Sequence, residues 1–388
     1  MDFDVVVVGS GLVGASLALA LETAGLNLAL IEAQPPQPGA GAADWDSRVY
    51  AISPGSAAFL ERCGVWQALD MTRVSRVEAM RVFGDDGRSE LDFSAYDAGL
   101  RELAFIVENR ELQRVLWAAL ERAQHVAVMA PAACKALTFA AQAAQLELGD
   151  GRVLSTRLMV GADGADSWVR AQTAIAIETR RYHQTAVVAN FAITTRHRGT
   201  AYQWFRHDGV LALLPLPGER VSMVWSTREE HAARLLELPS EELVAQVAAV
   251  SHGAVGDLQL ITPAAGFPLR LQRVRQLVLP RLALVGDAAH NVHPLAGQGV
   301  NLGFRDARQL AQVLMDRGSQ TDCGDYRLLR RYERARREDI VATQFATDSL
   351  QRLFNNEIAW LAGLRNCGLR LMNRQAQLKN LLVQHAVG

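Results

Sequence analysis

The chain has 388 residues, long enough for two interlocked domains with a large core. Its formal net charge is −1, whereas nucleic-acid-binding proteins are usually strongly basic. We therefore expect no nucleic acid as a partner. The charge is uneven, because residues 327–379 carry eleven basic and five acidic side chains, a local net charge of +6.

The first residues, MDFDVVVVGS, run straight into a strand-like sequence with no basic leader and no cleavage site. No run of about 18 uncharged apolar residues occurs, so we expect no membrane-spanning helix. The four cysteines (Cys63, Cys134, Cys323 and Cys367) form no C-x-x-C pair. They indicate reduced thiols in a cytoplasmic protein, and neither a disulfide framework nor a metal site.

The N-terminal segment predicts one βαβ unit. Val5–Val8 is a continuous valine run, as expected for a strand that is buried on both faces of a parallel sheet. An apolar, alanine-rich helix is predicted from Leu12 to Ala24, with Gly25 at its C-terminal end. A second parallel strand is predicted from Leu26 to Ile31.

The middle of the chain has a different pattern, which predicts mainly antiparallel strands. Hairpins are predicted around the GDDG turn (Val77–Phe83 with Ser89–Phe93) and around the Gly149–Gly151 turn, with a helix between them at Asn109–Ala123. Alternating apolar and polar runs from Arg180 to Thr227 are typical of an antiparallel sheet, and a helix is predicted to follow at Ser240–Val250. The parallel-sheet pattern returns at Leu282, and the chain is predicted to be helical from about Tyr326.

A glycine-rich motif follows the first strand. Gly9 permits a tight turn, Gly11 lets the backbone approach a diphosphate, and Gly14 lets the helix pack closely on the strand. The exposed backbone N–H groups and the helix dipole then favour an anion. Glu32 lies 18 residues beyond Gly14, where it can accept hydrogen bonds from an adenosine ribose. The motif alone does not separate FAD from NAD.

Two further stretches favour FAD. Val160–Gly164, which contains Asp163, resembles the second fingerprint of flavin monooxygenases, in which the aspartate and the nearby backbone serve FAD. Gly286–His290 resembles the third fingerprint, whose aspartate, here Asp287, binds the ribityl chain. Either stretch alone could be an ordinary Asp-Gly turn after a strand. Three such elements in this order favour a flavoprotein.

One longer motif resembles a specific family. Residues 293–306, HPLAGQGVNLGFRD, are similar to the signature of the ubiquinone-biosynthesis FAD-dependent hydroxylases, of the 2-polyprenylphenol hydroxylase type, within the para-hydroxybenzoate-hydroxylase-like fold. Supporting pieces are Asp46–Ile52, Gly64–Trp66, Val107–Arg110 and Arg330–Arg334. The resemblance runs from Val5 to about Arg337.

The resemblance implies an α/β fold: a Rossmann-like FAD-binding domain, an inserted antiparallel-sheet substrate domain and a C-terminal helical segment. We expect the FAD-binding domain to be discontinuous, at residues 1–75, 100–175 and 270–330. The substrate domain is expected at residues 76–99 and 176–269, and the C-terminal helices at residues 331–388.

The resemblance also implies a set of residues that contact FAD. Arg48 can lie beside the flavin, and the glycine-rich loop from Pro294 to Gly303 opens a helix whose backbone amides can face the flavin. Arg110 and Gln113 share one face of a helix, which without the resemblance would be a solvated face. The expected cofactor-binding residues are Gly9, Gly11, Leu12, Val13, Gly14, Glu32, Ala33, Arg48, Arg110, Gln113, Asp163, Gly286, Asp287, Pro294, Gly297, Gly299, Val300 and Asn301.

The implied chemistry is monooxygenation of an aromatic ring. Reduced FAD reacts with O2 to give a C4a-hydroperoxide, whose distal oxygen is transferred to an electron-rich phenol while the protein keeps water away. No second complete nucleotide-binding fold is evident. We therefore expect the electron donor, which is NAD(P)H or a separate reductase, to bind only transiently. The sequence identifies no catalytic acid or base, and Tyr202, His183 and His207 are only candidates. His290 and His293 lack the partners of a zinc site, so no metal is expected.

The expected substrate is a polyprenylphenol intermediate of ubiquinone biosynthesis, a choice that comes from the resemblance. Tyr202, Trp204 and Phe205 could supply an apolar surface for it, or could simply form the core of the sheet. Two other functions stay open: a related flavin hydroxylase acting on another aromatic or lipid compound, and a non-catalytic flavin-binding subunit of a biosynthetic complex. The basic C-terminal segment suggests peripheral contact with the inner face of a membrane or with partner subunits.

Overall fold

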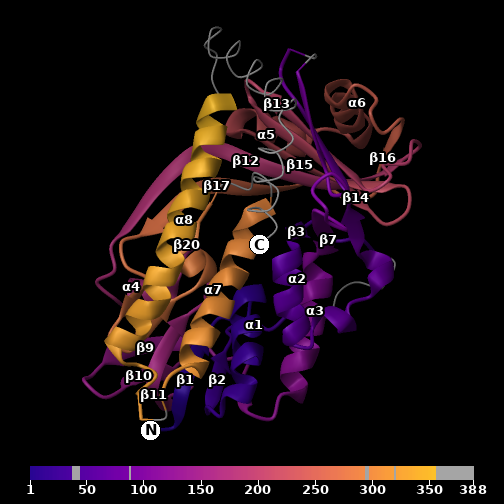
Figure 1. The fold of residues 1–388 in the computed structure, drawn as a ribbon. Helices are drawn as coiled ribbons and strands as arrows, with labels where there is room; N and C mark the ends of the chain where they lie inside the picture. The colour runs from indigo at the N-terminus through magenta and orange to yellow at the C-terminus, as the bar shows by residue number, and fades with distance from the viewer. Residues whose placement is uncertain (37–43, 87–88, 293–296, 319, 355–388) are drawn as a thin grey trace.

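The computed structural model describes residues 1–36, 44–86, 89–292, 297–318 and 320–354 (Figure 1). The N-terminal βαβ unit belongs to an eight-stranded sheet in which β1 (Phe3–Val8) lies between β2 (Leu28–Ile31) and β11 (Val153–Gly161), all three parallel. Val5, Val6 and Val7 are fully buried, as predicted for a strand covered on both faces. The other strands of this sheet are β8 (Val126–Met129), β9 (Cys134–Phe139), β10 (Ala144–Leu148), β18 (Val278–Leu279) and β19 (Leu282–Leu284).

Helices cover one face of this sheet (Figure 1). α1 (Leu12–Leu21) packs between α3 (Asn109–Arg122) and α7 (Gln298–Met315), and α8 (Tyr326–Phe354) runs beside α7. A short 3-10 helix, η1 (Glu22–Ala24), follows α1 and ends at Gly25, whose left-handed φ of 64° suits glycine. The remaining short elements of this half are α2 (Pro54–Arg62), α4 (Trp168–Ala171), η2 (Trp66–Ala68), η3 (Met71–Arg73) and η4 (Gly286–Ala288).

A nine-stranded, mainly antiparallel sheet forms the second layer. Its longest strand, β12 (Ile177–Ile193), pairs with β15 (Arg220–Arg228) and β17 (Ala265–Val274). The other strands are β5 (Ala79–Phe83), β6 (Glu90–Ser94), β13 (Thr200–Arg206), β14 (Gly209–Leu216), β16 (Leu258–Leu260) and β20 (His290–Asn291). A small antiparallel sheet of β3 (Val49–Ile52), β7 (Ala104–Glu108) and β4 (Ser75–Val77) packs between the two larger sheets.

The two faces of the nine-stranded sheet have different neighbours. α5 (Glu229–Glu237) and α6 (Ser240–Ser251) cover the outer face, where they pack on Val187, Leu211 and Trp225. The opposite face, here called the inner face, packs through Ala201, Leu214 and Leu216 on the small three-stranded sheet. The inner face is therefore directed toward the half of the molecule that contains the glycine-rich motif.

The predicted α/β class is confirmed, including the Rossmann-like part, the antiparallel part in the middle of the chain and the C-terminal helix. Two details differ. α5 was not predicted, and the strand expected at Val77–Phe83 is divided at Glu78, because Val77 pairs with β7 whereas Ala79 pairs with β13 and β6. Within the described part of the chain, no helix is both long and apolar enough to span a membrane.

Candidate functional site

The glycine-rich loop after β1 combines two crowded positions with one open position. At Gly9, which has φ of 102°, an added Cβ would lie 2.5 Å from the carbonyl oxygen of Ala162, and at Gly14 it would overlap the carbonyl oxygen of Gly9. At Gly11 an added Cβ would meet no atom within 4 Å. The packing of the chain therefore requires glycine at positions 9 and 14. The space at Gly11 is free, and it lies beside the N-terminus of α1, where backbone N–H groups have no partner within the helix.

Glu32, at the end of β2, lies against this loop. One of its carboxylate oxygens accepts hydrogen bonds from the backbone N–H (2.7 Å) and the hydroxyl (2.9 Å) of Ser10, and the other accepts one from the N–H of Gln34 (2.9 Å). A carboxylate offers about four acceptor positions, so Glu32 can accept a further hydrogen bond. The neighbouring Ala33 is exposed.

Asp163 carries an acceptor atom without a partner. Its Oδ2 accepts a hydrogen bond from the N–H of Val169 at 2.9 Å, whereas its Oδ1 is buried and has no hydrogen-bond partner among the described residues. The Asp163 Cα would lie 2.8 Å from a Cβ added at Gly9, so the second motif adjoins the first. A buried acceptor without a donor is costly, and a ligand hydroxyl would remove that cost.

The third motif forms a turn against the start of α1. Gly286 has φ of 59°, and a Cβ added there would lie 3.2 Å from a methyl group of Val13, which also packs against Gly303 of α7. The side chain of Asp287 in this turn is exposed to solvent. The protein around it nevertheless raises the pKa of Asp287 by desolvation, and the positive charges of His290, Arg48 and Arg270 oppose this rise.

These three motifs meet because the strands that carry them are parallel. Gly9, Glu32, Asp163 and Gly286 follow the carboxyl ends of β1, β2, β11 and β19, which are neighbours in one sheet. In open α/β sheets, ligands bind at this edge. Leu12, the first residue of α1, is buried below it.

The N-terminus of α7 holds the next group of predicted residues. Gly297 is left-handed (φ 64°), and an added Cβ would lie 2.9 Å from the Cβ of Ala51, whereas at Gly299 the nearest atom is 3.9 Å away. Asn301 donates to the carbonyl oxygens of Ala51 (2.8 Å) and Gly297 (3.1 Å) and accepts from the N–H of Ser53 (2.9 Å). The Asn301 side chain therefore fixes α7 to β3 and to the N-cap residue of α2. Val300 is half-buried, and Pro294 lies outside the described residues.

Arg48 lies where the two halves of the molecule meet. Its guanidinium carbon is 5.4 Å from the ring centre of Tyr50 on β3 and 5.5 Å from that of Phe267 on β17. Burial raises the pKa of Tyr50, and the charge of Arg48 opposes that rise. Arg48 is exposed, and its positive charge also opposes the raised pKa of Asp287 in the third motif.

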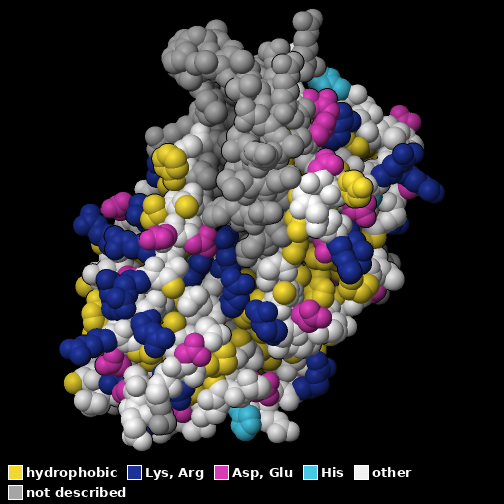
Figure 2. Space-filling model, in the orientation of Figure 1, with side chains coloured by type: hydrophobic (Ala, Val, Ile, Leu, Met, Phe, Trp, Pro, Cys, Tyr) yellow, Lys and Arg dark blue, Asp and Glu magenta, His cyan; other side chains and the backbone are white. Residues whose placement is uncertain are grey.

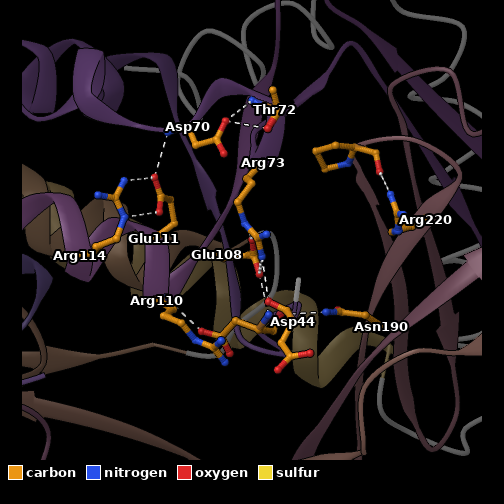
Figure 3. A network of polar contacts seen from close by, with 12 residues as sticks. Asp44, Asp70, Thr72, Arg73, Glu108, Arg110, Glu111, Arg114, Asn190 and Arg220 are labelled. Atoms are coloured by element: carbon orange, nitrogen blue, oxygen red, sulfur yellow. Dashed lines mark hydrogen bonds and ion pairs between the residues drawn. The ribbon is translucent and has the colours of Figure 1, made fainter. Parts of the chain in front are cut away.

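A polar network fixes residues 44–48, here called the 44–48 strap (Figure 3). Glu108, only 2% exposed, accepts hydrogen bonds from Arg73 (2.7 and 2.9 Å) and from the N–H of Asp46 (2.6 Å). Asn190 of β12 donates to the carbonyl oxygen of Asp46 at 2.8 Å. The strap is thus attached both to the end of β7 and to the inner face of the nine-stranded sheet.

The same strap holds the start of α3. The carboxylate of Asp46 accepts hydrogen bonds from the backbone N–H groups of Arg48 (2.9 Å) and Arg110 (3.0 Å). Gln113, one turn into α3, accepts a hydrogen bond from Asn109 at 3.3 Å, and the side chains of Arg110 and Gln113 are half-buried. The predicted helix face therefore adjoins Arg48. Asp46 and Glu108 occur in the motifs quoted above, but sequence reasoning gave them no role.

The three candidate proton-transfer residues do not come together. Tyr202 lies on the outer face of the nine-stranded sheet with Trp204, under α5 and α6. His183 is exposed at an irregularity of β12, where its φ is 53°, and His207 is exposed in the turn between β13 and β14. Phe205 is on the other face but is buried against Val82, Leu91 and Val210. The hydrophobic surface suggested for Tyr202 and Trp204 is therefore the core under the outer helices, because alternation along β13 directs both toward α5 and α6.

Comparisons with known proteins identify the family of this chain. The family model described as an FAD binding domain matches residues 2–347. A ubiquinone hydroxylase of Rhodospirillum rubrum is 37% identical over 387 residues, covering 99% of this chain and 89% of that protein. The 3-demethoxyubiquinol 3-hydroxylase of Escherichia coli is 34% identical over 388 residues, covering 99% and 98%.

Solved structures support the same fold. The crystal structure of PqsL from Pseudomonas aeruginosa superimposes with a TM-score of 0.79 at 24% identity, covering 95% of this chain and 99% of that one. The matched family and the two hydroxylases extend over nearly the whole chain. The chain therefore belongs to the FAD-binding-domain family and, within it, to the FAD-dependent monooxygenases of the ubiquinone hydroxylase type.

Proposed function

We propose that this chain binds FAD along the edge formed by β1, β2, β11 and β19. The diphosphate would occupy the free space at Gly11, the adenosine ribose would contact Glu32, and Asp163 would accept a hydrogen bond from the cofactor through its unpartnered Oδ1. Asp287 would bind the ribityl chain, and the backbone from Gly297 to Asn301 would face the flavin ring. Two observations support this fit: the space at Gly11 and the buried acceptor on Asp163.

We further propose that the protein hydroxylates a polyprenylphenol intermediate of ubiquinone biosynthesis with O2. Bound FAD, once reduced, would supply the oxygen-activating chemistry expected above. NAD(P)H or a separate reductase would supply the electrons transiently. The residues of this chain would bind and orient the ring, and exclude water from the reacting centre.

The observation that carries this proposal is the position of Arg48. Its guanidinium lies over Tyr50 of β3 and Phe267 of β17, so the cofactor half of the molecule and the inner face of the nine-stranded sheet meet at this side chain. A ring held on the inner face would therefore lie next to the flavin. Phe267 lies on this inner face and is 38% exposed, so its ring is accessible to a bound aromatic compound.

The inner face suits an apolar ring because its side chains are mostly small. Directly paired residues share a face, so Phe267, Ala186 and Ser226 form one row across β17, β12 and β15, and Val188 and Val224 begin the next. Val224 is only half-buried although β15 is a central strand. We propose that residues 76–99 and 176–269 act as the substrate domain through this face, and that the three remaining segments before residue 331 bind FAD.

A labelling experiment tests the proposed reaction. The purified protein is expected to release FAD and no FMN on denaturation, and to oxidise NAD(P)H, alone or with an added reductase, when a polyprenylphenol is present. Product formed under 18O2 is expected to contain one heavy oxygen, measured by mass spectrometry, because the transferred atom comes from O2. Oxygen derived from water instead would contradict the proposed reaction.

Deleting the gene separates this function from the two alternatives. We expect an unhydroxylated polyprenylphenol to accumulate in lipid extracts, and Asp287→Ala not to reverse the accumulation. Accumulation of a different aromatic compound would assign another substrate. If a variant that binds no FAD restores normal quinone levels, the protein acts as a non-catalytic subunit.

We propose that the basic C-terminal segment contacts an anionic membrane surface, where a prenylated substrate resides. Arg327, Arg331, Arg334 and Arg337 are exposed on α8, and Figure 2 shows dark-blue side chains gathered along α7 and α8 on this face. Arg336, by contrast, is buried and paired with Asp306. The basic residues beyond residue 354 lie outside the described part.

Co-flotation with liposomes tests this contact. Changing Arg327, Arg331, Arg334 and Arg337 to glutamine is expected to lower the affinity for anionic liposomes by up to about a thousandfold, since each basic residue contributes about 1 kcal/mol near such a surface. The matched control changes four exposed arginines elsewhere, namely Arg101, Arg122, Arg198 and Arg234, and removes the same charge. Equal flotation of both variants would show that the basic residues of α8 do not contact the membrane. Contact with partner subunits would then be the alternative role.

A further inference from the structure

A fully buried carboxylate, Asp306 of α7, joins three separate elements of the FAD half. Its Oδ2 accepts hydrogen bonds from the backbone N–H of Gly286 (3.0 Å) and from Nε2 of His290 (2.5 Å). Its Oδ1 accepts one from Nε of Arg336 on α8 at 2.7 Å. Asp306 is 0% exposed, and His290 and Arg336 are 2% and 5% exposed.

The charges of these partners keep Asp306 ionised. Burial by itself would raise the pKa of Asp306, but the charges and hydrogen bonds of His290 and Arg336 outweigh burial and lower it. Because the carboxylate is ionised, it only accepts hydrogen bonds, so Nε2 of His290 must carry a proton. The imidazole of His290 is therefore directed, through its Nε2, toward Asp306.

The two donors to Oδ2 lie on either side of Asp287. Gly286 precedes Asp287, and His290 follows it by three residues, so one carboxylate oxygen fixes both ends of a five-residue turn. The turn begins at a left-handed glycine and lies against Val13 of α1. The direction in which Asp287 extends therefore depends on Asp306.

The charge of Arg336 offsets the free-energy cost of burying the Asp306 carboxylate. Arg336 also pairs with Asp339 one turn along α8, and Asp339 in turn pairs with Arg305 at 2.8 Å. A buried charge without a partner is strongly destabilising, so the carboxylate that holds the turn requires α8 in place. The cluster of two acids, two arginines and His290 connects α8 to the Asp287 turn.

We infer that Asp306 is a positioning residue for FAD binding, acting through His290 and the backbone of Gly286 to hold Asp287 in the orientation that contacts the cofactor. This role rests on the FAD site proposed above. Through Asp306 and Arg336, α7 and α8 would affect FAD affinity indirectly, in addition to any direct contact with FAD. We assign Asp306 no contact of its own with the substrate, because it is 0% exposed.

The test measures FAD binding by the flavin-free protein, through quenching of flavin fluorescence, together with the thermal midpoint of unfolding of the same preparation. Asp306→Asn keeps the volume but turns an amide N–H2 toward existing donors. We expect its dissociation constant for FAD to rise about tenfold, as for loss of one hydrogen bond to a charged group.

Asp339→Asn is the matched control, because it removes an acid from the same cluster and contacts Arg336 without touching the turn. The positioning role predicts that this variant loses thermal stability but keeps FAD affinity within about threefold. If both variants lose affinity in proportion to stability, Asp306 is only a structural acid and the inference is wrong. If the wild-type protein binds no FAD, the proposed function fails first, and the inference with it.

A second pair of variants keeps the test decisive if Asp306→Asn does not fold. His290→Gln retains an N–H donor near the position of Nε2, whereas His290→Leu removes the donor at similar volume. We expect His290→Gln to bind FAD nearly as the wild type does and His290→Leu to bind severalfold more weakly. Equal affinity of both variants would overturn the inference, because the hydrogen bond to Asp306 would then be irrelevant to the turn.

Discussion

Gly11→Val is expected to weaken FAD binding about tenfold to a hundredfold while leaving the flavin-free protein folded. Gly11 has φ of −60° and ψ of 179°, which valine adopts readily, and an added Cβ meets no atom within 4 Å. The valine methyl groups would instead occupy the space proposed for the diphosphate. Overpacking of that kind costs about 1–3 kcal/mol, so FAD affinity should fall about tenfold to a hundredfold. Thermal unfolding without flavin should change only by the modest cost of valine at a helix N-cap, about 1 kcal/mol.

Gly14→Ala is expected to lower the stability of the flavin-free protein itself, which Gly11→Val should change little. Its Cβ would overlap the carbonyl oxygen of Gly9 and lie 3.0 Å from the Cβ of Ala162, so α1 must move away from β1 even without cofactor. We expect a loss of about 1–3 kcal/mol in the free energy of unfolding of the flavin-free protein. Fluorescence titration with FAD and denaturant unfolding of both variants measure the two effects. Normal FAD affinity in Gly11→Val would place the diphosphate elsewhere.

The position of these glycines could be predicted because their roles are local. A valine run, a tight turn and an apolar helix follow one another within about twenty residues, and each has its own sequence pattern. The convergence of Asp163 and Asp287 on the same edge follows from one further rule, that parallel strands end on one side of a sheet. Motifs far apart in the chain are then brought together by topology alone.

The partners of buried charges could not be predicted in this way. Asp306 binds Arg336, 30 residues later, and Asn190 binds Asp46, 144 residues earlier, on different elements. Sequence patterns indicate which face of a helix or strand is buried. They do not indicate which residue of another element contacts that face. Asp306 and Glu108 were both inside recognised motifs, yet nothing in the motifs indicates which donors surround their carboxylates.

Alternation along a strand likewise leaves the choice of face undetermined. The pattern of β13 separates Tyr202 and Trp204 from Phe205, but only the positions of α5 and α6 show that the first two lie on the outer face. α5 itself is nine residues long and begins with two glutamates directly after a strand, so its helical pattern is short. The side chains of the inner face are mostly small and carry little signal for any sequence pattern.

Glu108→Gln is expected to weaken both the fold and FAD binding. The substitution removes the charge that pairs with Arg73 and turns an amide N–H2 toward donors that include the N–H of Asp46. Loss of a hydrogen bond to a charged group costs about 1.5–3 kcal/mol, and the low end applies because Arg73 is 20% exposed. The 44–48 strap would loosen, and Arg48 with it, so we expect FAD affinity to fall severalfold.

Glu111→Gln tests whether that loss comes from the strap. Glu111 is 8% exposed, belongs to the same helix region and also accepts from an arginine, Arg114, and from a backbone N–H, that of Asp70 (Figure 3). Its partners lie away from residues 44–48, so Glu111→Gln should lower the thermal midpoint without changing FAD affinity by more than about twofold. If the two variants weaken FAD binding equally for the same loss of stability, the network around Glu108 stabilises the fold in general. If only Glu108→Gln does so, the strap that crosses from β7 to the inner face is what holds Arg48 beside the cofactor.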